Sequence, residues 1–116
     1  MCGRFSFAQL AQAIADSFNL TSVPEVSPRY NISPTQEVAT ILNNAPESDR
    51  ECKLLYWGLI PSWAKDPKMG AKLINARAET IDEKPSFRSA FKKRRCLILA
   101  DGFYEWQQQN GKKQPY

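Results

Sequence analysis

The chain has 116 residues, of which 42% are hydrophobic and 11% aromatic, and it contains no histidine. This length corresponds to one domain at most, with enough apolar material to bury a core. The lack of imidazole excludes a Ser-His-Asp or Cys-His catalytic unit and a His-ligated metal within these residues. Three cysteines, at positions 2, 52 and 96, are too few for a four-thiolate zinc site and indicate reduced, intracellular thiols.

The net charge of +4 is distributed unevenly along the chain. Residues 1–51 carry a net charge of −3, and residues 52–116 carry +7. The basic half favours an anionic partner such as nucleic acid, or it forms a solvated basic face. No apolar stretch approaches the roughly 20 residues of a membrane span, and the N-terminus lacks the pattern of a signal peptide. We therefore expect a cytoplasmic protein without membrane contact.

The first predicted element is a helix over residues 7–18. Ser6 and Gln9 match a capping box, and Phe5 and Leu10 occupy the two positions of a hydrophobic staple. Apolar residues then recur every three or four positions, which gives the helix one apolar face.

The rest of the chain is predicted to form short strands, with two irregular segments and a second helix. In chain order these are an ordered loop at 21–37, a strand at 38–42, a turn at 45–50, a strand at 52–60, an irregular stretch at 61–72, an alternating segment at 73–80, a helix within 85–95, and strands at 96–100, 103–109 and 112–116. Asp101-Gly102 and Asn110-Gly111 separate the last three strands as tight turns. Because a domain rarely ends on a short, unfinished hairpin arm, we expect the chain to be a fragment.

Cys2 is unusual because it directly follows the initiator methionine. Removal of Met1, which aminopeptidases carry out when the next residue is small, exposes an amine and a thiol on adjacent carbons. α-Amines and thiols both lose protons not far above neutral pH, so both nucleophilic forms are present. Such an aminothiol condenses with an aldehyde to form a five-membered thiazolidine ring. The alternative is that Cys2 is an incidental small residue.

Asn75, Arg77 and Glu79 alternate along residues 73–80, so in a strand their side chains would share one face. Together they could orient a reactant, hold a phosphate and move a proton, or they could form a solvent-facing edge with a salt bridge. Glu105 lies between two aromatic residues, which suits a general acid but is also typical of a partly exposed strand residue.

Trp63 lies in a predicted loop with three lysines, Lys65, Lys68 and Lys72. This combination suits base stacking with phosphate contacts, although Trp63 could instead plug the core. The cationic run at residues 92–95 either contacts a nucleic-acid backbone or complements the dipole of a helix C-terminus. Cys52 and Cys96 lie in apolar strands, and we expect both to be buried thiols without a chemical role.

Five segments, in this order, resemble the SOS-response-associated peptidase (SRAP) family, whose members process abasic sites. They are MCGRF at 1–5, YNISP at 30–34, WG and PSW within 57–63, NARAET at 75–80 and ADGFYEW at 100–106. The resemblance covers residues 1–116 and implies a single SRAP domain whose C-terminal portion is missing.

The resemblance implies that Met1 is removed, by the chain itself or by an aminopeptidase. Cys2 then traps the ring-opened aldehyde of an abasic site in single-stranded DNA as a thiazolidine cross-link. In the same way, Asn75 would hydrogen-bond near the reacting amine, and Glu105 would move protons. Two arginines would hold phosphates, and a proline and a tryptophan would wedge into the DNA at the lesion. These four DNA-binding positions are Arg4, Pro34, Trp63 and Arg77.

The implied fold class is α+β, with a compact, bent, mostly antiparallel and barrel-like β-core and short flanking helices. The resemblance implies no metal or other cofactor, and a nucleoid-associated role in the DNA damage response. Uncovered sheet edges in such a fragment predict a homo-oligomer. Two other functions stay open: a non-covalent module for single-stranded or damaged DNA, and a peptidase whose cleavage is limited to Met1.

Overall fold

A computed structural model describes residues 1–44 and 49–116. The helices are α1 (Ala11–Phe18) and α2 (Arg88–Lys93), with a 3₁₀ helix η1 (Pro67–Lys72). The strands are β1 (Phe5–Phe7), β2 (Arg29–Ile32), β3 (Glu37–Asn44), β4 (Asp49–Tyr56), β5 (Cys96–Ile98), β6 (Gly102–Phe103), β7 (Trp106–Gln109) and β8 (Lys112–Pro115). Most of the turn predicted at 45–50 lies outside the described residues.

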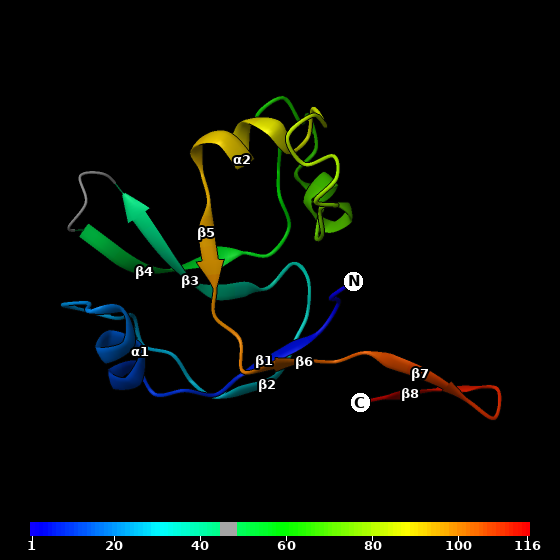
Figure 1. Cartoon of the computed structure of the whole chain (residues 1–116), viewed down its shortest axis with the longest axis horizontal. Coiled ribbons are helices and arrows are strands. Elements are labelled where there is room, and N and C mark those ends of the chain that lie inside the picture. The colour runs from blue at the N-terminus through cyan, green and yellow to red at the C-terminus, as the bar shows by residue number, and fades with distance from the viewer. Residues whose placement is uncertain (45–48) are drawn as a thin grey trace.

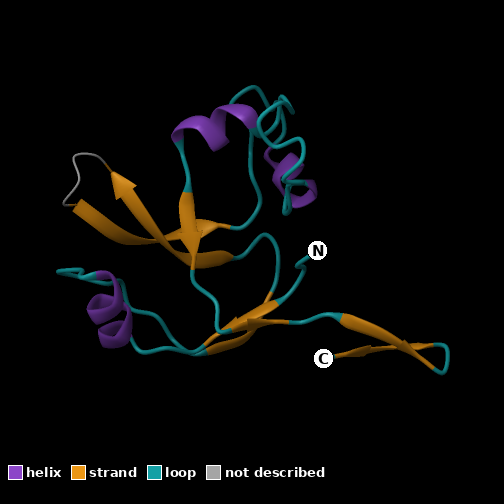
Figure 2. Ribbon diagram, in the orientation of Figure 1, coloured by secondary structure: helices purple, strands orange, loops and turns teal. Residues whose placement is uncertain are grey.

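The strands form two three-stranded antiparallel sheets and a separate hairpin (Figure 1). One sheet has the order β2-β1-β6 and the other the order β4-β3-β5, while β7 pairs with β8. The short helices lie outside the sheets (Figure 2). The predicted α+β class with antiparallel strands is confirmed. Among the described residues, however, the two sheets share no strand, so they do not close into the predicted barrel-like core.

Within the part of the chain that the structure describes, one hydrophobic cluster joins the two sheets. Its buried members are Phe5, Phe7, Ile14, Ile32, Val38, Ala39, Ile41, Cys52, Trp57 and Leu99. The rings of Phe5 and Trp57 pack with their centroids 5.2 Å apart at 58°. The indole N–H of Trp57 donates a hydrogen bond to the Ile74 carbonyl over 3.0 Å, which satisfies the polar atom of a buried ring and holds this part of the chain against the core.

Helix α1 begins four residues later than predicted. Phe5 and Phe7 are buried strand residues, because β1 pairs with β2 on one side and with β6 on the other. The carboxylate of Asp101 accepts hydrogen bonds from the Ala8 N–H at 2.7 Å and from the Gln9 side chain at 2.9 Å. Gln9 is therefore engaged by a residue far along the chain, and the predicted capping box does not form.

The strands predicted at 38–42 and 52–60 are confirmed as β3 and β4, although β4 ends at Tyr56. The loop predicted at 21–37 contains β2, which pairs with β1. The segment at 73–80 is not a strand. Its second half folds into consecutive turns, in which the Thr80 N–H donates to the Arg77 carbonyl over 3.2 Å, so local bonds satisfy backbone groups that a strand would pair with a neighbour.

Asp101-Gly102 does not connect a hairpin. β5 pairs with β3 and β6 pairs with β1, so the chain crosses here from one sheet to the other. In contrast, Asn110-Gly111 forms the predicted tight turn between β7 and β8. Both residues have positive φ, 47° and 74°, as a type I′ turn requires. The helix predicted within 85–95 is confirmed as α2.

Gly58 and Gly70 bring two backbone segments into close contact. Gly58 has a φ of +137°, and a Cβ atom added there would lie 2.4 Å from the carbonyl oxygen of Gly70. Only glycine tolerates both this conformation and this approach. The contact holds η1 against the end of β4 and closes the irregular stretch that carries Trp63.

Candidate functional site

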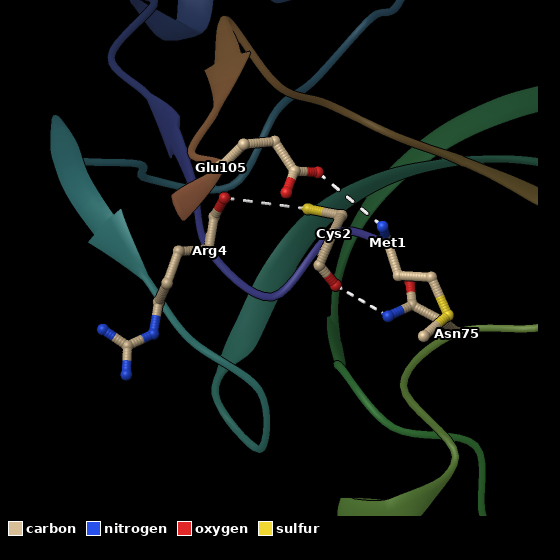
Figure 3. Close-up of polar contacts among 5 residues, drawn as sticks. All are labelled: Met1, Cys2, Arg4, Asn75 and Glu105. Carbon is tan, nitrogen blue, oxygen red and sulfur yellow. Dashed lines mark hydrogen bonds and ion pairs between the residues drawn. The ribbon is translucent and has the colours of Figure 1, made fainter. Parts of the chain in front are cut away.

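Cys2 is half-buried just before β1, packs against the hydrophobic cluster, and has its Sγ 3.7 Å from the carbonyl oxygen of Arg4 (Figure 3). Strand β1 is the middle strand of its sheet and is hydrogen-bonded on both sides. An N-terminus paired into a sheet frays less than a free one, so the position of Cys2 is fixed by the fold.

Asn75 contacts the backbone of Cys2. Its Nδ2 donates a hydrogen bond to the Cys2 carbonyl oxygen over 2.7 Å, in a partly buried position. The preceding residue, Ile74, is held by the indole of Trp57. The structure therefore brings this predicted site residue to Cys2 through a core contact, although the segment is not the predicted strand.

Glu105 approaches the N-terminus from the other side. Its Oε1 lies 3.7 Å from the α-ammonium of Met1, and its side chain is 41% exposed. Its backbone is fixed by two reciprocal hydrogen bonds with Tyr116, of 3.0 Å and 2.9 Å. The nitrogen that removal of Met1 would free as an amine belongs to Cys2, one residue further along the chain.

Both the backbone carbonyl and the side chain of Arg4 accept or donate hydrogen bonds. Its carbonyl oxygen accepts the Tyr104 N–H at 2.9 Å and the Cys2 thiol, and its guanidinium donates to the Asn31 side-chain oxygen over 3.2 Å. The Tyr104 hydroxyl in turn donates to the Tyr30 carbonyl over 2.7 Å. The Arg4 guanidinium points away from the thiol in Figure 3. Sequence reasoning missed Asn31 and Tyr104, although both lie within segments that it singled out.

Arg77 and Glu79 are not part of this group. They form an ion pair of 3.8 Å, with side chains 79% and 73% exposed. None of the hydrogen bonds or ion pairs among residues 1–44 and 49–116 connects either side chain to Cys2 or Glu105. The structure therefore agrees with the alternative interpretation of this segment, in which Arg77 and Glu79 form a solvent-facing salt bridge.

Pro34 lies in a rigid turn. The next residue, Thr35, has a φ of 70°, and its N–H donates to the Trp57 carbonyl over 2.9 Å. The side-chain oxygen of Gln36 accepts the Ser33 N–H at 3.1 Å, and the backbone carbonyl of Gln36 accepts the backbone N–H of Trp57 at 2.9 Å. A β-branched residue at positive φ is unusual and is held here by bonds on both sides of the turn.

Trp63 is 55% exposed and therefore does not plug the core, whereas Trp57 is 7% exposed and does belong to it. The loop is closed by a hydrogen bond from the Ala64 N–H to the Pro61 carbonyl over 2.9 Å. After it, the Asp66 side chain caps η1 by accepting the Lys68 N–H. An exposed indole on a fixed loop is a surface on which an aromatic ring can stack.

The two other cysteines differ from each other. Cys52 is buried as predicted, and this burial raises the pKa of its thiol. Cys96 was also predicted to be buried but is exposed, because β5 is an edge strand that pairs only with β3. Within the described part of the chain, no cluster of three or more metal-binding side chains occurs, and no helix is long and apolar enough to cross a membrane.

Asn75 thus contacts the backbone of Cys2, and Glu105 contacts the ammonium of Met1, so an amide and a carboxylate lie on the two residues that begin the chain (Figure 3). A comparison with protein families matches residues 1–116 to the SOS response associated peptidase (SRAP) family. The chain belongs to the SRAP family.

Several relatives carry functional names. Abasic site processing protein YoqW of Bacillus subtilis (strain 168) is 50% identical over 109 residues, which cover 91% of this chain and 48% of the relative. YoaM, from the same organism and with the same description, is 46% identical over 115 residues, or 97% of this chain and 50% of the relative. Abasic site processing protein HMCES of Xenopus tropicalis is 46% identical over 99 residues, or 77% of this chain and 30% of the relative.

Solved structures support the same fold. A Bacteroides thetaiotaomicron protein superposes with a TM-score of 0.79 at 27% identity, over 98% of this chain and 52% of its own. A Bordetella bronchiseptica protein gives a TM-score of 0.74 at 27% identity, over 98% of this chain and 55% of its own. The chain therefore spans about half the length of the bacterial relatives that it matches.

Proposed function

We propose that this SRAP chain processes abasic sites, and that it does so by joining Cys2 covalently to the ring-opened sugar in single-stranded DNA. The observation that carries the proposal is that Asn75 bonds to the Cys2 carbonyl while Glu105 pairs with the nitrogen of the residue just before Cys2. The names of the relatives support the substrate class. The product would protect the lesion from strand cleavage during the DNA damage response.

The reaction begins with hydrolysis of the Met1–Cys2 peptide bond, which consumes one water and frees the Cys2 amine. The amine adds to the aldehyde carbon of the abasic sugar, and loss of one water gives an imine. The Cys2 sulfur then adds to the same carbon as its proton passes to the nitrogen, which closes the thiazolidine. No oxidant or metal is consumed in these steps.

Two side chains assist this chemistry. Glu105 lies 3.7 Å from the Met1 nitrogen, and after Met1 is removed we assign to it the proton that leaves the attacking Cys2 amine and returns to the departing water. Asn75 fixes the Cys2 carbonyl, so the amine and thiol of this residue keep one orientation toward the aldehyde. We assign the autocatalytic part of Met1 removal to the same carboxylate, and any peptide cleavage is limited to this bond.

DNA binding is assigned to four residues, of which Arg77 lies outside the group at Cys2 and would exchange its ion pair with Glu79 for a phosphate. The arginines Arg4 and Arg77 contact phosphates, the rigid turn at Pro34 wedges beside the lesion, and Trp63 stacks on a base. An intact nucleotide offers no aldehyde, so the specificity lies in the chemistry and not in the base sequence. We infer a cytoplasmic, nucleoid-associated location from this substrate.

Incubation with single-stranded DNA that carries one abasic site tests the proposal. A band that survives heating in detergent is expected from the wild type and from Cys96→Ala, which removes an exposed thiol without an adjacent amine. Cys2→Ala should form no such band. Intact mass identifies the samples that have lost Met1. Reversible binding that is unchanged by Cys2→Ala and abolished by Trp63→Ala would instead establish a non-covalent binding module.

A further inference from the structure

Arg4 and Asn31 form a contact that follows from the pairing of β1 with β2. Phe5 pairs with Ile32, and the two residues that precede them in their own segments are Arg4 and Asn31. The Arg4 Nη1 donates to the Asn31 Oδ1 over 3.2 Å. Arg4 is also the residue whose carbonyl contacts the Cys2 thiol, so the backbone of Arg4 lies beside the nucleophile while Asn31 holds its guanidinium.

The partner of Arg4 is a neutral amide. Across residues 1–44 and 49–116, no ion pair involves Arg4, whereas Arg77 pairs with Glu79. A guanidinium has five N–H donors, and the amide accepts one of them. The full positive charge and the remaining donors of Arg4 therefore stay available for an anion, in contrast to Arg77, whose charge faces a carboxylate.

We propose that Asn31 is a positioning residue, which aims the Arg4 guanidinium at a phosphate next to the lesion without neutralising it. This inference rests on the proposed function, because it requires DNA at Cys2. A bidentate contact between a guanidinium and a phosphate depends on the orientation of its plane, which a hydrogen bond at Nη1 restricts. The amide thus supplies orientation, while a carboxylate at the same place would compete with the phosphate.

Asn31→Asp tests this idea because it keeps the shape of the side chain and changes the acceptor into a carboxylate. Binding is measured with single-stranded DNA that carries a non-reactive tetrahydrofuran analogue of the abasic site, over a range of salt concentrations. We expect about a tenfold loss of affinity. The slope of the logarithm of the binding constant against the logarithm of the salt concentration should become shallower by about 0.7, the value for one phosphate contact on a single strand. Asn43→Asp, an exposed asparagine on β3, adds the same charge elsewhere and controls for net charge.

A double-mutant cycle separates positioning from a general effect of charge or folding. In an Arg4→Met background, Asn31→Asp should cost no more affinity than Asn43→Asp does. Equal effects of the two aspartates in the wild-type background, or an undiminished effect in the Arg4→Met background, would overturn the proposal. The analogue cannot cross-link, so failure of the covalent reaction would leave this binding test readable.

Discussion

Asn75 donates a hydrogen bond to the carbonyl of Cys2 across 73 positions of sequence. The bond joins a segment of irregular structure to the residue that precedes a central strand. Since Asn75 follows the residue that accepts the Trp57 indole N–H, core packing and the position of Cys2 are directly linked.

Asn75→Ala should slow formation of the heat-stable adduct about tenfold, because the Cys2 carbonyl loses the bond that fixes its orientation. The measurement is the adduct fraction against time at saturating DNA. Asn43→Ala, on β3, is the matched control and should react at the wild-type rate. Wild-type kinetics in Asn75→Ala would remove this residue from the site.

Glu105→Gln should reduce the rate of adduct formation by about 100-fold, the range typical of a lost general acid or base. It should change the free energy of unfolding by less than about 0.5 kcal/mol, because its ion pair with Met1 is largely exposed. Quench kinetics and urea denaturation give the two values. Glu79→Gln breaks another exposed ion pair and should leave the rate unchanged. A large loss of stability in Glu105→Gln would indicate a structural role.

Gly58→Ala should destabilise the fold by about 2 kcal/mol or more, because the new Cβ meets the Gly70 carbonyl and the backbone has positive φ. Gly102→Ala is the control, since a Cβ there meets nothing within 4 Å. Urea denaturation compares the two variants. If they unfold at the same urea concentration, the close contact between the two backbone segments does not contribute to stability.

Trp63→Ala should weaken binding to single-stranded DNA by about tenfold, as expected for the loss of one stacked base. Its exposed ring contributes little to the core, so thermal stability should change little. Trp106 is similarly exposed, at 51%, and Trp106→Ala is the matched control. Equal losses of affinity in both variants would argue against a specific role for the loop of Trp63.

Cys52 should react with iodoacetamide about tenfold more slowly than Cys96 at pH 8, because thiolate access limits the reaction. Burial raises the pKa of Cys52, and desolvation also raises the pKa of Cys96, although that residue is exposed. Access to the reagent therefore separates the two. Peptide mass spectrometry after timed quenching measures both rates, and equal rates would show that the sheet around Cys52 opens readily.

The sequence predicts correctly those elements whose conformation depends on neighbouring residues alone. The Asn110-Gly111 turn needs positive φ at both residues, and this requirement is visible in the sequence. The start of α1 was missed because Gln9 binds Asp101, a residue 92 positions away. Similarly, Asp101-Gly102 has the composition of a hairpin turn, but the pairing of β6 with β1 carries the chain into another sheet.

The site shows the same division between local and long-range determinants. The positions of Cys2, Asn75 and Glu105 were predicted from motifs, and the structure brings all three to the N-terminus. The alternation around Arg77 suggested a shared face, but those residues form turns, so Arg77 pairs with Glu79 instead. Asn31 could not be singled out from composition, because its contact depends on the register between β1 and β2.

The place of β1 in the middle of its sheet has a mechanical consequence. A DNA strand joined to Cys2 would pull on a chain that is hydrogen-bonded to β2 on one side and to β6 on the other. Tension on the strand would therefore have to shear two sets of hydrogen bonds before the N-terminus could be drawn out.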